Sequence, residues 1–354
     1  MYTESLLKEA VDKNASDIFI ITGLPVMYKI NGMFVPDRGK PLTTEDTTQI
    51  IKGLYDIIAD RDIDRLFKSG DDDFSLTMPG VSRFRVNAYK QRSSFAAVIR
   101  VIQFSLPNPK ELGIPQVVMD LAKKRNGMIL VTGTAGSGKS TTLACLIDHI
   151  NKTRTGHIVT LEDPLEFLHK HDQCIISQRE VPTDTEDYVR ALRASLRQAP
   201  NVVLLGEMRD YETISVAMTA AETGHLIFST LHTVGAANTI DRVIDAFPPN
   251  QQHQIRAQLS MVLQAVVSQH LIPTIDNRIV PAFEVMLVNN AIRNMIRESK
   301  IHQIDSVIHS SASMGMLTMD ASLISLYKKG IISDKSAVIY SSNPEIMEKK
   351  LAMG

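Results

Sequence analysis

The stretch Gly133-Thr134-Ala135-Gly136-Ser137-Gly138-Lys139-Ser140 decides the fold class of this 354-residue chain. It matches the pattern G-x-x-x-x-G-K-[ST] in full. The apolar run Met128–Thr132 precedes it and a helical pattern through about Ile150 follows it, which is the strand–loop–helix setting of a phosphate-binding loop (P-loop). Glycines let backbone N–H groups turn toward phosphate oxygens, and the helix N-terminus adds the positive end of its dipole. A glycine-rich turn that matches by chance would need neither flanking element.

Two side chains of the motif have specific roles. Lys139 supplies a positive charge to the β- and γ-phosphates of a nucleotide, and the Ser140 hydroxyl is a ligand for Mg²⁺. The residues expected to bind the phosphates are therefore Gly133, Thr134, Ala135, Gly136, Ser137, Gly138, Lys139, Ser140 and Thr141.

Short apolar runs alternate with helical patterns through the middle of the chain, which predicts an α/β fold with parallel strands and right-handed crossovers. Ligands bind outside the carboxyl ends of the strands in such a sheet. Polar residues follow each run, so we expect them to meet at one nucleotide-binding edge. The four runs are Met128–Thr132, His157–Leu161, Val202–Leu205 and Leu226–Ser229.

Glu207 is the main catalytic candidate, because it follows the apolar strand Val202–Leu205 after a single glycine. A carboxylate at this point polarises the attacking water and accepts its proton, or holds Mg²⁺ through a water molecule. The alternative is a carboxylate that only pairs with a nearby arginine.

A second acidic group, Glu162, Asp163 and Glu166, follows the strand His157–Leu161. At least one of these acids is expected to orient Mg²⁺-bound water or an arginine, and a simple helix cap is the alternative. Two histidines flank the fourth strand. We interpret His232, just past its end, as a sensor of the γ-phosphate, whereas His225, at its start, is catalytic or only structural.

The remaining pattern predicts three regions: an α+β domain over 1–106, the P-loop core over 107–273 and a mainly helical region over 274–354. A proline-containing linker, Ser105–Pro109, supports the first boundary. Residues 251–271 and 290–349 have mainly helical patterns, and Ile279–Met286 is a strand candidate. In the first domain we expect helices over 43–69 and near the N-terminus, an Asn31-Gly32 hairpin turn, and strands over 18–21, 26–30, 33–35, 83–89 and 96–102.

The composition excludes several protein classes. Lysine and arginine total 38 against 39 acids, which argues against a non-specific nucleic-acid binder. No apolar run approaches the 18–20 or so residues of a membrane span, and the N-terminus lacks a signal-peptide pattern. Cys145 and Cys174 are too few for a disulfide framework or a four-cysteine zinc site. These features predict a cytoplasmic protein with at most peripheral membrane contact.

One predicted helix carries Arg190, Arg193 and Arg197 at i, i+3 and i+7. Such a face is either solvated or an inter-subunit surface. An arginine supplied by a neighbouring subunit would make hydrolysis depend on assembly, but the composition does not identify which arginine does so.

The motifs taken in chain order resemble those of the secretion ATPases that power type II secretion and type IV pili. The resemblance runs from about Ala15 to about Ile332. Ala291–Glu298 is similar to the C-terminal signature of the pilus retraction ATPases within that superfamily, and Asn290 is expected to cap this helix. Besides the P-loop (Walker A), the matching segments are Thr160–Phe167 (Asp box), Gly206–Asp210 (Walker B) and Ala220–Thr233 (His box).

The resemblance implies a PAS-like N-terminal domain, a RecA-like P-loop ATPase domain with C-terminal helices, and a ring-shaped homohexamer. It implies ATP and Mg²⁺ as cofactors, Glu207 as the catalytic glutamate, and Arg85 and Arg100 as phosphate-contacting arginines of the N-terminal domain. The implied partner is the inner-membrane pilus platform protein (PilC-like), on the cytoplasmic face of the membrane. An assembly ATPase or a second retraction ATPase is a further candidate partner, and no nucleic acid is expected.

Two departures from the family pattern and four alternatives remain. Ala135 stands where threonine is more common, and Gln198–Asn201 stands where acids are common. An assembly or secretion ATPase usually has a four-cysteine zinc insertion, and a non-hydrolysing paralogue would not need an intact Lys139 and Glu207. A RecA-like nucleic-acid motor is disfavoured by the neutral charge, and a small GTPase by the missing guanine-recognition acid in Asn151–Arg154.

Overall fold

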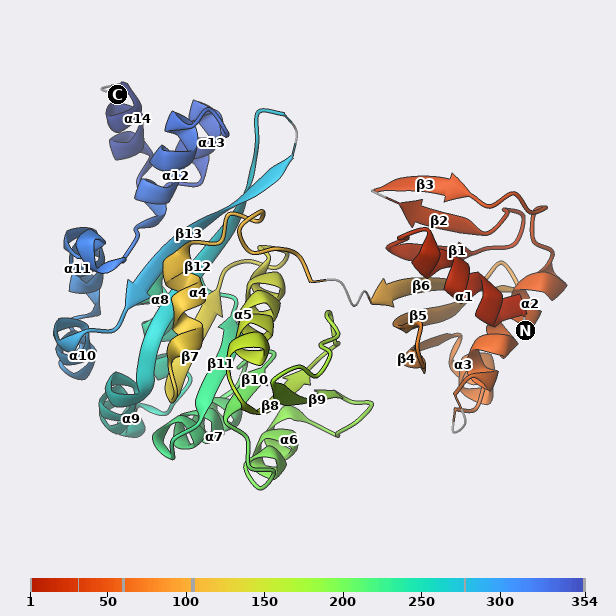
Figure 1. Ribbon diagram of the computed structural model, residues 1–354, viewed down its shortest axis with the longest axis horizontal. Coiled ribbons are helices and arrows are strands. Elements are labelled where there is room, and N and C mark those ends of the chain that lie inside the picture. The colour runs from red at the N-terminus through yellow and green to blue at the C-terminus, as the bar shows by residue number, and fades with distance from the viewer. Residues whose placement is uncertain (1, 31, 59–60, 103–105, 277, 353–354) are drawn as a thin grey trace. The chain divides into compact units, whose positions relative to one another are not determined.

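The computed structural model describes residues 2–30, 32–58, 61–102, 106–276 and 278–352 (Figure 1). The chain divides into two compact units. The first comprises Met1–Ser105 and the short segment Leu165–Leu168, and the second comprises Leu106–Pro164 and His169–Gly354. Asn31 of the expected hairpin turn and Ser105 of the expected linker lie outside the described residues.

The first unit is built on an antiparallel sheet with the strand order β3-β2-β1-β6-β5-β4. All the expected strands are present. Strand β4 was not predicted, because its acidic start, Asp71–Asp73, is unusual in a strand. Alternate β4 residues are buried against the helices. The elements are α1 (Tyr2–Asp12), β1 (Asp17–Ile20), β2 (Met27–Ile30), β3 (Met33–Pro36), α2 (Thr44–Asp56), α3 (Asp64–Ser69), β4 (Asp71–Met78), β5 (Ser82–Gln91) and β6 (Ser94–Ile102).

The second unit contains a seven-stranded sheet with the order β13-β12-β7-β11-β10-β8-β9. All four predicted core strands are present, and β7, β11, β10 and β8 lie side by side and parallel. The elements up to the last strand are α4 (Gln116–Met119), β7 (Gly127–Thr132), α5 (Lys139–Thr153), β8 (Gly156–Glu162), β9 (Cys174–Glu180), α6 (Tyr188–Ser195), β10 (Val202–Leu205), α7 (Tyr211–Glu222), β11 (Leu226–Leu231), α8 (Ala236–Asp245), α9 (Pro249–Val262), β12 (Leu263–Pro273) and β13 (Ile279–Leu287).

Helices cover both faces of this sheet, which explains why its central strands are apolar throughout. Successive residues of β7 alternate between two cores. Ile129 and Val131 pack with α4 and α5 on one face, whereas Met128 and Leu130 pack with α6 to α11 on the other. The P-loop strand is thus held rigidly at the centre of the sheet.

The helical prediction for 251–271 is wrong in its second half. Helix α9 ends at Val262, and β12 begins at the next residue. No glycine or proline marks the change, and a short apolar run does not distinguish a buried strand from a buried helix. Strand pairing makes residues 263–273 a strand, because β12 lies parallel to β7 and antiparallel to β13. Strand β9, at the sheet edge, was also missed.

The C-terminal region is mainly helical, as predicted. The cap of α10 is Asn289, which accepts from the Ile292 N–H at 2.9 Å, and not the expected Asn290. Arg293 donates to two carbonyls at the end of α9, those of Ser260 and Met261, so this arginine ties α10 to α9. The helices are α10 (Asn290–Arg297), α11 (Ile304–Ser310), α12 (Met319–Lys328), α13 (Asp334–Ile339) and α14 (Pro344–Ala352), and 3₁₀ turns cover Asp120–Lys123, Ile301–Gln303 and Ala312–Met314.

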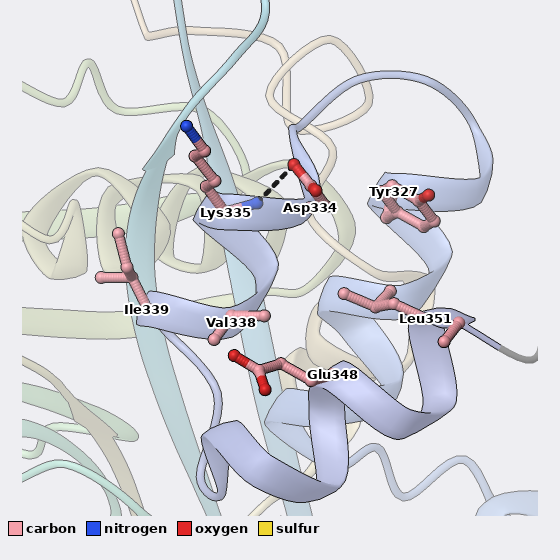
Figure 2. A pocket seen from close by; sticks show the side chains of 8 residues that line it. Tyr327, Asp334, Lys335, Val338, Ile339, Glu348 and Leu351 are labelled. Atoms are coloured by element: carbon pink, nitrogen blue, oxygen red, sulfur yellow. Dashed lines mark hydrogen bonds between the residues drawn. The ribbon is translucent and has the colours of Figure 1, made fainter.

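The last three helices border a surface pocket of about 490 Å³ (Figure 2). Apolar side chains such as Val338 and Leu351 share its wall with Lys335 and Glu348. None of its lining residues belongs to the polar loops at the carboxyl edge of the sheet. Within the described part of the chain, no helix combines the length and the apolar character of a membrane span.

Candidate functional site

The carboxyl ends of four adjacent strands form the candidate site. The Gly133 N–H donates to the Leu231 carbonyl at 3.3 Å, which joins the P-loop to the end of β11. The Gly206 N–H donates to the Leu161 carbonyl at 2.8 Å, and the Thr230 hydroxyl donates to the Gly206 carbonyl at 2.6 Å. These bonds continue the strand pairing into the loops. The loops after β7, β11, β10 and β8 therefore leave the sheet next to one another, as the sequence predicts.

The P-loop, residues 133–140, turns through three glycines with positive φ: 141° at Gly133, 75° at Gly136 and 86° at Gly138. Two of them also lack room for a side chain. A Cβ on Gly133 would lie 2.3 Å from the Gln269 carbonyl oxygen, and a Cβ on Gly138 would lie 2.8 Å from Gln269 Nε2. The loop shape therefore depends on glycine and on the close approach of β12.

The N-terminus of α5 is suited to an anion. Its N-cap is Gly138, and no side chain caps it, whereas Asp210 caps helix α7. Lys139 Nζ donates to the carbonyls of Gly133 and Thr134, at 2.9 Å each, so the ammonium lies inside the loop. A helix N-terminus and a buried ammonium at one point create a strong positive potential for phosphate.

The loop residues fit a nucleotide phosphate group and its Mg²⁺. Residues 134–136 are exposed, Ser137 is buried, and Ser140 and Thr141 are half-buried at the start of α5. In the described part of the chain, Ser137 Oγ is buried without a hydrogen-bond partner, as is expected of a group that a ligand satisfies. The Ser140 hydroxyl lies in the first helical turn, which is the position of the Mg²⁺ ligand in a P-loop.

Glu207 lies at the centre of the edge, and its side chain is only 12% exposed. Its Oε1 is 2.6 Å from Arg209 Nη2, so the predicted alternative of an arginine pair is present in this structure. This pairing raises the pKa of Arg209. Its Oε2 lies 3.5 Å from His232 Nε2, but this buried oxygen has no hydrogen-bond partner among the residues described. The structure thus brings Glu207 and His232 together and leaves one carboxylate oxygen for a water molecule.

Tyr188, the first residue of α6, belongs to this site and was missed from the sequence. A Cβ on Gly206 would lie 2.8 Å from the Tyr188 hydroxyl oxygen, so this hydroxyl lies over the backbone beside Glu207. Burial raises the pKa of Tyr188, and the charges of Asp163, Glu207 and Glu162 raise it further. The hydroxyl therefore stays protonated near three carboxylates. Nothing in the local sequence distinguishes this tyrosine from an ordinary core aromatic residue.

The acids that follow β8 have different positions. Glu162 is the last residue of β8 and is half-buried. Because Leu161 and Leu205 are register partners, Glu162 lies at the same edge as Glu207. Glu166 is exposed and belongs to the segment Leu165–Leu168, which groups with the first unit. The catalytic role of Glu166 stays a prediction.

Within one chain, His225 lies at the other end of β11 from His232, and its catalytic role stays a prediction. It precedes β11, and its carbonyl accepts from the Gly127 N–H at the start of β7. The six residues of β11 separate it from His232, which corresponds to about 20 Å of extended chain. His225 Nδ1 lies 3.0 Å from the Ala220 carbonyl at the end of α7. This is the structural alternative that the sequence left open.

The two arginines expected to contact phosphate from the first unit lie opposite each other on β5 and β6. Arg85 forms two bonds to Asp73, at 2.6 and 3.2 Å, and Arg100 Nε lies 3.1 Å from Asp17. Both arginine side chains are at least 37% exposed. The two are side by side, and their contact with a nucleotide remains a prediction.

Of the three arginines predicted on one helix, Arg190 and Arg193 lie on α6 and Arg197 does not. Arg190 pairs with Glu186, and Arg193 pairs with Glu212 of α7 at 2.9 Å. Helix α6 ends at Ser195, so Arg197 lies beyond it. Two of the three thus have local acidic partners on the unit's own surface.

Gln269 of β12 is a second residue that sequence reasoning missed. Its Oε1 accepts from the Thr142 hydroxyl of α5 at 2.8 Å, and both side chains are buried. Together with the contacts to Gly133 and Gly138, this bond fixes the P-loop to β12. No sequence signal reveals it, since 127 positions separate Gln269 from Thr142.

Comparison with known proteins gives consistent matches over nearly the whole chain. The family model described as "Type II/IV secretion system protein" matches residues 1–316. The chain is 44% identical to the type IV pilus retraction ATPase PilT of Pseudomonas aeruginosa, over 96% of this chain and 98% of that protein. It is 36% identical to the type IV pilus ATPase PilU of the same species, over 100% of this chain and 92% of that protein.

A solved structure matches the fold of the chain. The crystal structure of the pilus retraction motor PilT with bound ADP has a TM-score of 0.88 and 44% sequence identity, and the match covers 98% of each chain.

Proposed function

The chain belongs to the family of type II/IV secretion system proteins, and on this premise we propose that it is an ATP-hydrolysing motor that powers the retraction of type IV pili. The resemblance inferred from the motifs is confirmed. The proposal depends most on one observation: a complete P-loop lies at the same sheet edge as a buried Glu207 next to His232. The chain that carries this site aligns with a pilus retraction ATPase over nearly its full length.

We assign each residue at this edge of the sheet a separate role in ATP hydrolysis. Lys139 and the N-terminus of α5 bind and orient the phosphates. Glu207 Oε2, which is buried and not hydrogen-bonded to a described residue, accepts a proton from the attacking water. To His232, which lies 3.5 Å from the same oxygen, we assign the detection of the γ-phosphate. Mg²⁺, held by Ser140 and through water by Glu207, would neutralise charge on the phosphates.

The Glu207–Arg209 pair fits this assignment as a resting arrangement. Arg209 is 74% exposed, so its side chain moves away from Glu207 at little packing cost. Glu207 is only 12% exposed, so its carboxylate needs a new partner once Arg209 leaves. Nucleotide binding would therefore exchange Arg209 for water or Mg²⁺ at this carboxylate.

The proposal extends to assembly and location. We propose a ring-shaped homohexamer, with a PAS-like first unit whose Arg85 and Arg100 contact the nucleotide phosphates. The ring would act on a PilC-like platform protein at the cytoplasmic face of the inner membrane. A P-loop edge that is exposed at residues 134–136 supports completion of the site by a neighbouring group.

The direction of the motor is tested in the source organism. The gene is deleted, surface pili are counted by electron microscopy, and the deletion is complemented with wild type or with Glu207→Gln. Excess pili that only the wild type returns to normal support retraction powered by this site. Bald cells would instead show an assembly ATPase, and full complementation by Glu207→Gln would refute the catalytic assignment.

The site itself is tested with purified protein. Lys139→Ala is expected to abolish nucleotide binding or turnover. Glu207→Gln is expected to bind ATP with little change and to hydrolyse it about a hundredfold more slowly, which is the usual loss for a general base. Arg209→Gln, which removes the ion-pair partner of Glu207 but no proposed catalytic group, serves as the control and should stay within a few fold of wild type.

A further inference from the structure

The loop that carries His232 is anchored from β12 and β13, the two strands at one end of the sheet. This His232 loop, residues 232–235, joins β11 to α8. The Gly235 N–H donates to Ser268 Oγ of β12 at 3.0 Å. The next N–H, that of Ala236, donates to Glu284 Oε1 of β13 at 2.8 Å. Both anchors come from residues more than 30 positions away in the sequence.

The strand register explains why these two anchors lie together. Ser268 is the cross-strand partner of Thr132 on one side and of Glu284 on the other. The three residues therefore form a row across β7, β12 and β13, at the point where β7 enters the P-loop. Gln269, the next residue of β12, faces the opposite side and holds the P-loop through Thr142. Adjacent residues of β12 thus support the two loops of the site separately.

Glu284 also reaches the C-terminal helices. The next residue of β13, Val285, pairs with Leu317, two residues before α12, through backbone bonds of 2.7 and 3.0 Å. Glu284 is almost fully enclosed, with 9% exposure. Burial raises the pKa of Glu284, and the backbone groups of Ala236 and of Met319, the first residue of α12, oppose this shift. One buried carboxylate therefore lies at the first residues of two helices, α8 and α12, and accepts a hydrogen bond from that of α8.

Helix α8 depends on this distant carboxylate for its cap. Its N-cap is Gly235, with φ of 85°, and no side chain of its own segment caps it. Helix α12 differs, because Thr318 caps it locally at the Ala321 N–H. Loss of Glu284 would therefore affect the start of α8, and with it the His232 loop, more than the start of α12.

We propose that Glu284 is a positioning residue that fixes the His232 loop and ties its geometry to the N-terminal end of α12. A force or partner that displaces α12 would then alter the position of His232. The catalytic part of this inference rests on the proposed function, in which His232 senses the γ-phosphate. The structural part, the shared carboxylate, does not.

The expected consequence is a selective loss of turnover. Displacing a catalytic group by about 1 Å can lower the rate about a hundredfold, whereas the P-loop keeps its own anchor on Gln269. For Glu284→Ala we expect kcat to fall about tenfold to a hundredfold and the KM for ATP to change less than about threefold. Glu284→Gln retains an acceptor oxygen and should restore most of the turnover.

Two further variants separate the two connections. Ser268→Ala removes an anchor of the His232 loop and leaves α12 untouched. Ser322→Ala is the matched control, because Ser322 Oγ accepts from the Phe283 N–H at 3.1 Å and so links α12 to β13 without the loop. We expect Ser268→Ala to lower kcat in the same direction as Glu284→Ala, and Ser322→Ala to leave kcat unchanged.

Amide hydrogen exchange on the full-length protein without nucleotide gives a readout that does not require activity. Glu284→Ala should accelerate exchange at both Ala236 and Met319, and Glu284→Gln should do so less. Unchanged exchange at Ala236 would overturn the inference, and so would accelerated exchange with kcat within twofold of wild type. A wild-type protein that hydrolyses no ATP would refute the proposed function, and the exchange data would then decide the shared anchor alone.

Discussion

The Thr142–Gln269 bond allows a quantitative test of how β12 supports the P-loop. The two side chains are 1% and 3% exposed, and the bond is 2.8 Å long. Thr142→Val keeps the shape of the side chain and leaves Gln269 Oε1 buried without this donor. Such an unsatisfied group costs about 1–3 kcal/mol. Gln269→Leu should cost less, about 1 kcal/mol, because a helical threonine hydroxyl can bond to the carbonyl one turn earlier.

The double variant Thr142→Val/Gln269→Leu removes both polar partners, and replacing both by apolar groups is nearly neutral. The coupling energy between the two sites is therefore expected to be about 2–4 kcal/mol in magnitude. If the whole cost falls on the nucleotide-bound loop, the Kd for ADP rises about fivefold to a hundredfold for Thr142→Val. The double variant should recover most of that affinity.

Two quantities are measured for the wild type, the two single variants and the double variant, all as full-length chains. They are the affinity for a fluorescent ADP analogue, from titration, and the opening free energy of the α5 amides, from hydrogen exchange. Thr160→Val is the matched control, since the Thr160 hydroxyl is buried with no hydrogen-bond partner among the described residues and its loss should cost little. Equal effects of Thr142→Val and Thr160→Val, or strict additivity in the double variant, would refute the reasoning.

Three further outcomes are expected. Gly133→Ala should weaken ADP binding more than tenfold, because its Cβ would lie 2.3 Å from a backbone carbonyl oxygen of β12. Gly136 has open space around it, so Gly136→Ala should cost only about 1 kcal/mol of backbone strain. Isothermal titration with ADP compares the two variants. Burial raises the pKa of Glu284, so the folded state favours the protonated side chain, and the stability that this contributes below the unfolded pKa is lost as the pH rises through the folded pKa. Urea unfolding should therefore show wild type losing stability relative to Glu284→Gln as the pH is raised from about 4, near the ordinary pKa of glutamate. Burial raises the pKa of Cys145 to about 11, so a thiol reagent at pH 8 should label it only after unfolding; rapid labelling of the native protein would contradict its burial.

Several parts of the fold were readable from short stretches of the chain. The P-loop depends on glycines within a few positions of one another, and their positive φ values are a local property. The central strands are continuous apolar runs because helices cover both faces of the sheet. The meeting of their polar loops follows from the common direction of parallel strands, which is why Glu207 and His232 were placed correctly at one edge.

Other parts could not be read locally. Strand β12 looks like the continuation of α9, and only the partners on both of its sides make it a strand. His225 and His232 lie in the same short segment, Ala220–Thr233, but the extended length of β11 places the two at opposite ends of the sheet. Tyr188 enters the site because α6 packs against β8, the neighbour of β10, and no local pattern encodes its contact with Gly206.

By itself, then, the sequence determined the class of the protein, the phosphate-binding loop and the edge of the sheet at which chemistry is expected, because these depend on neighbouring residues and on strand direction. Only the tertiary structure decided how that loop is supported. Gln269 holds the P-loop, and Ser268 and Glu284 hold the His232 loop. These contacts join residues that are distant in the chain, and strand register, which a sequence of apolar residues leaves open, selects which of them meet.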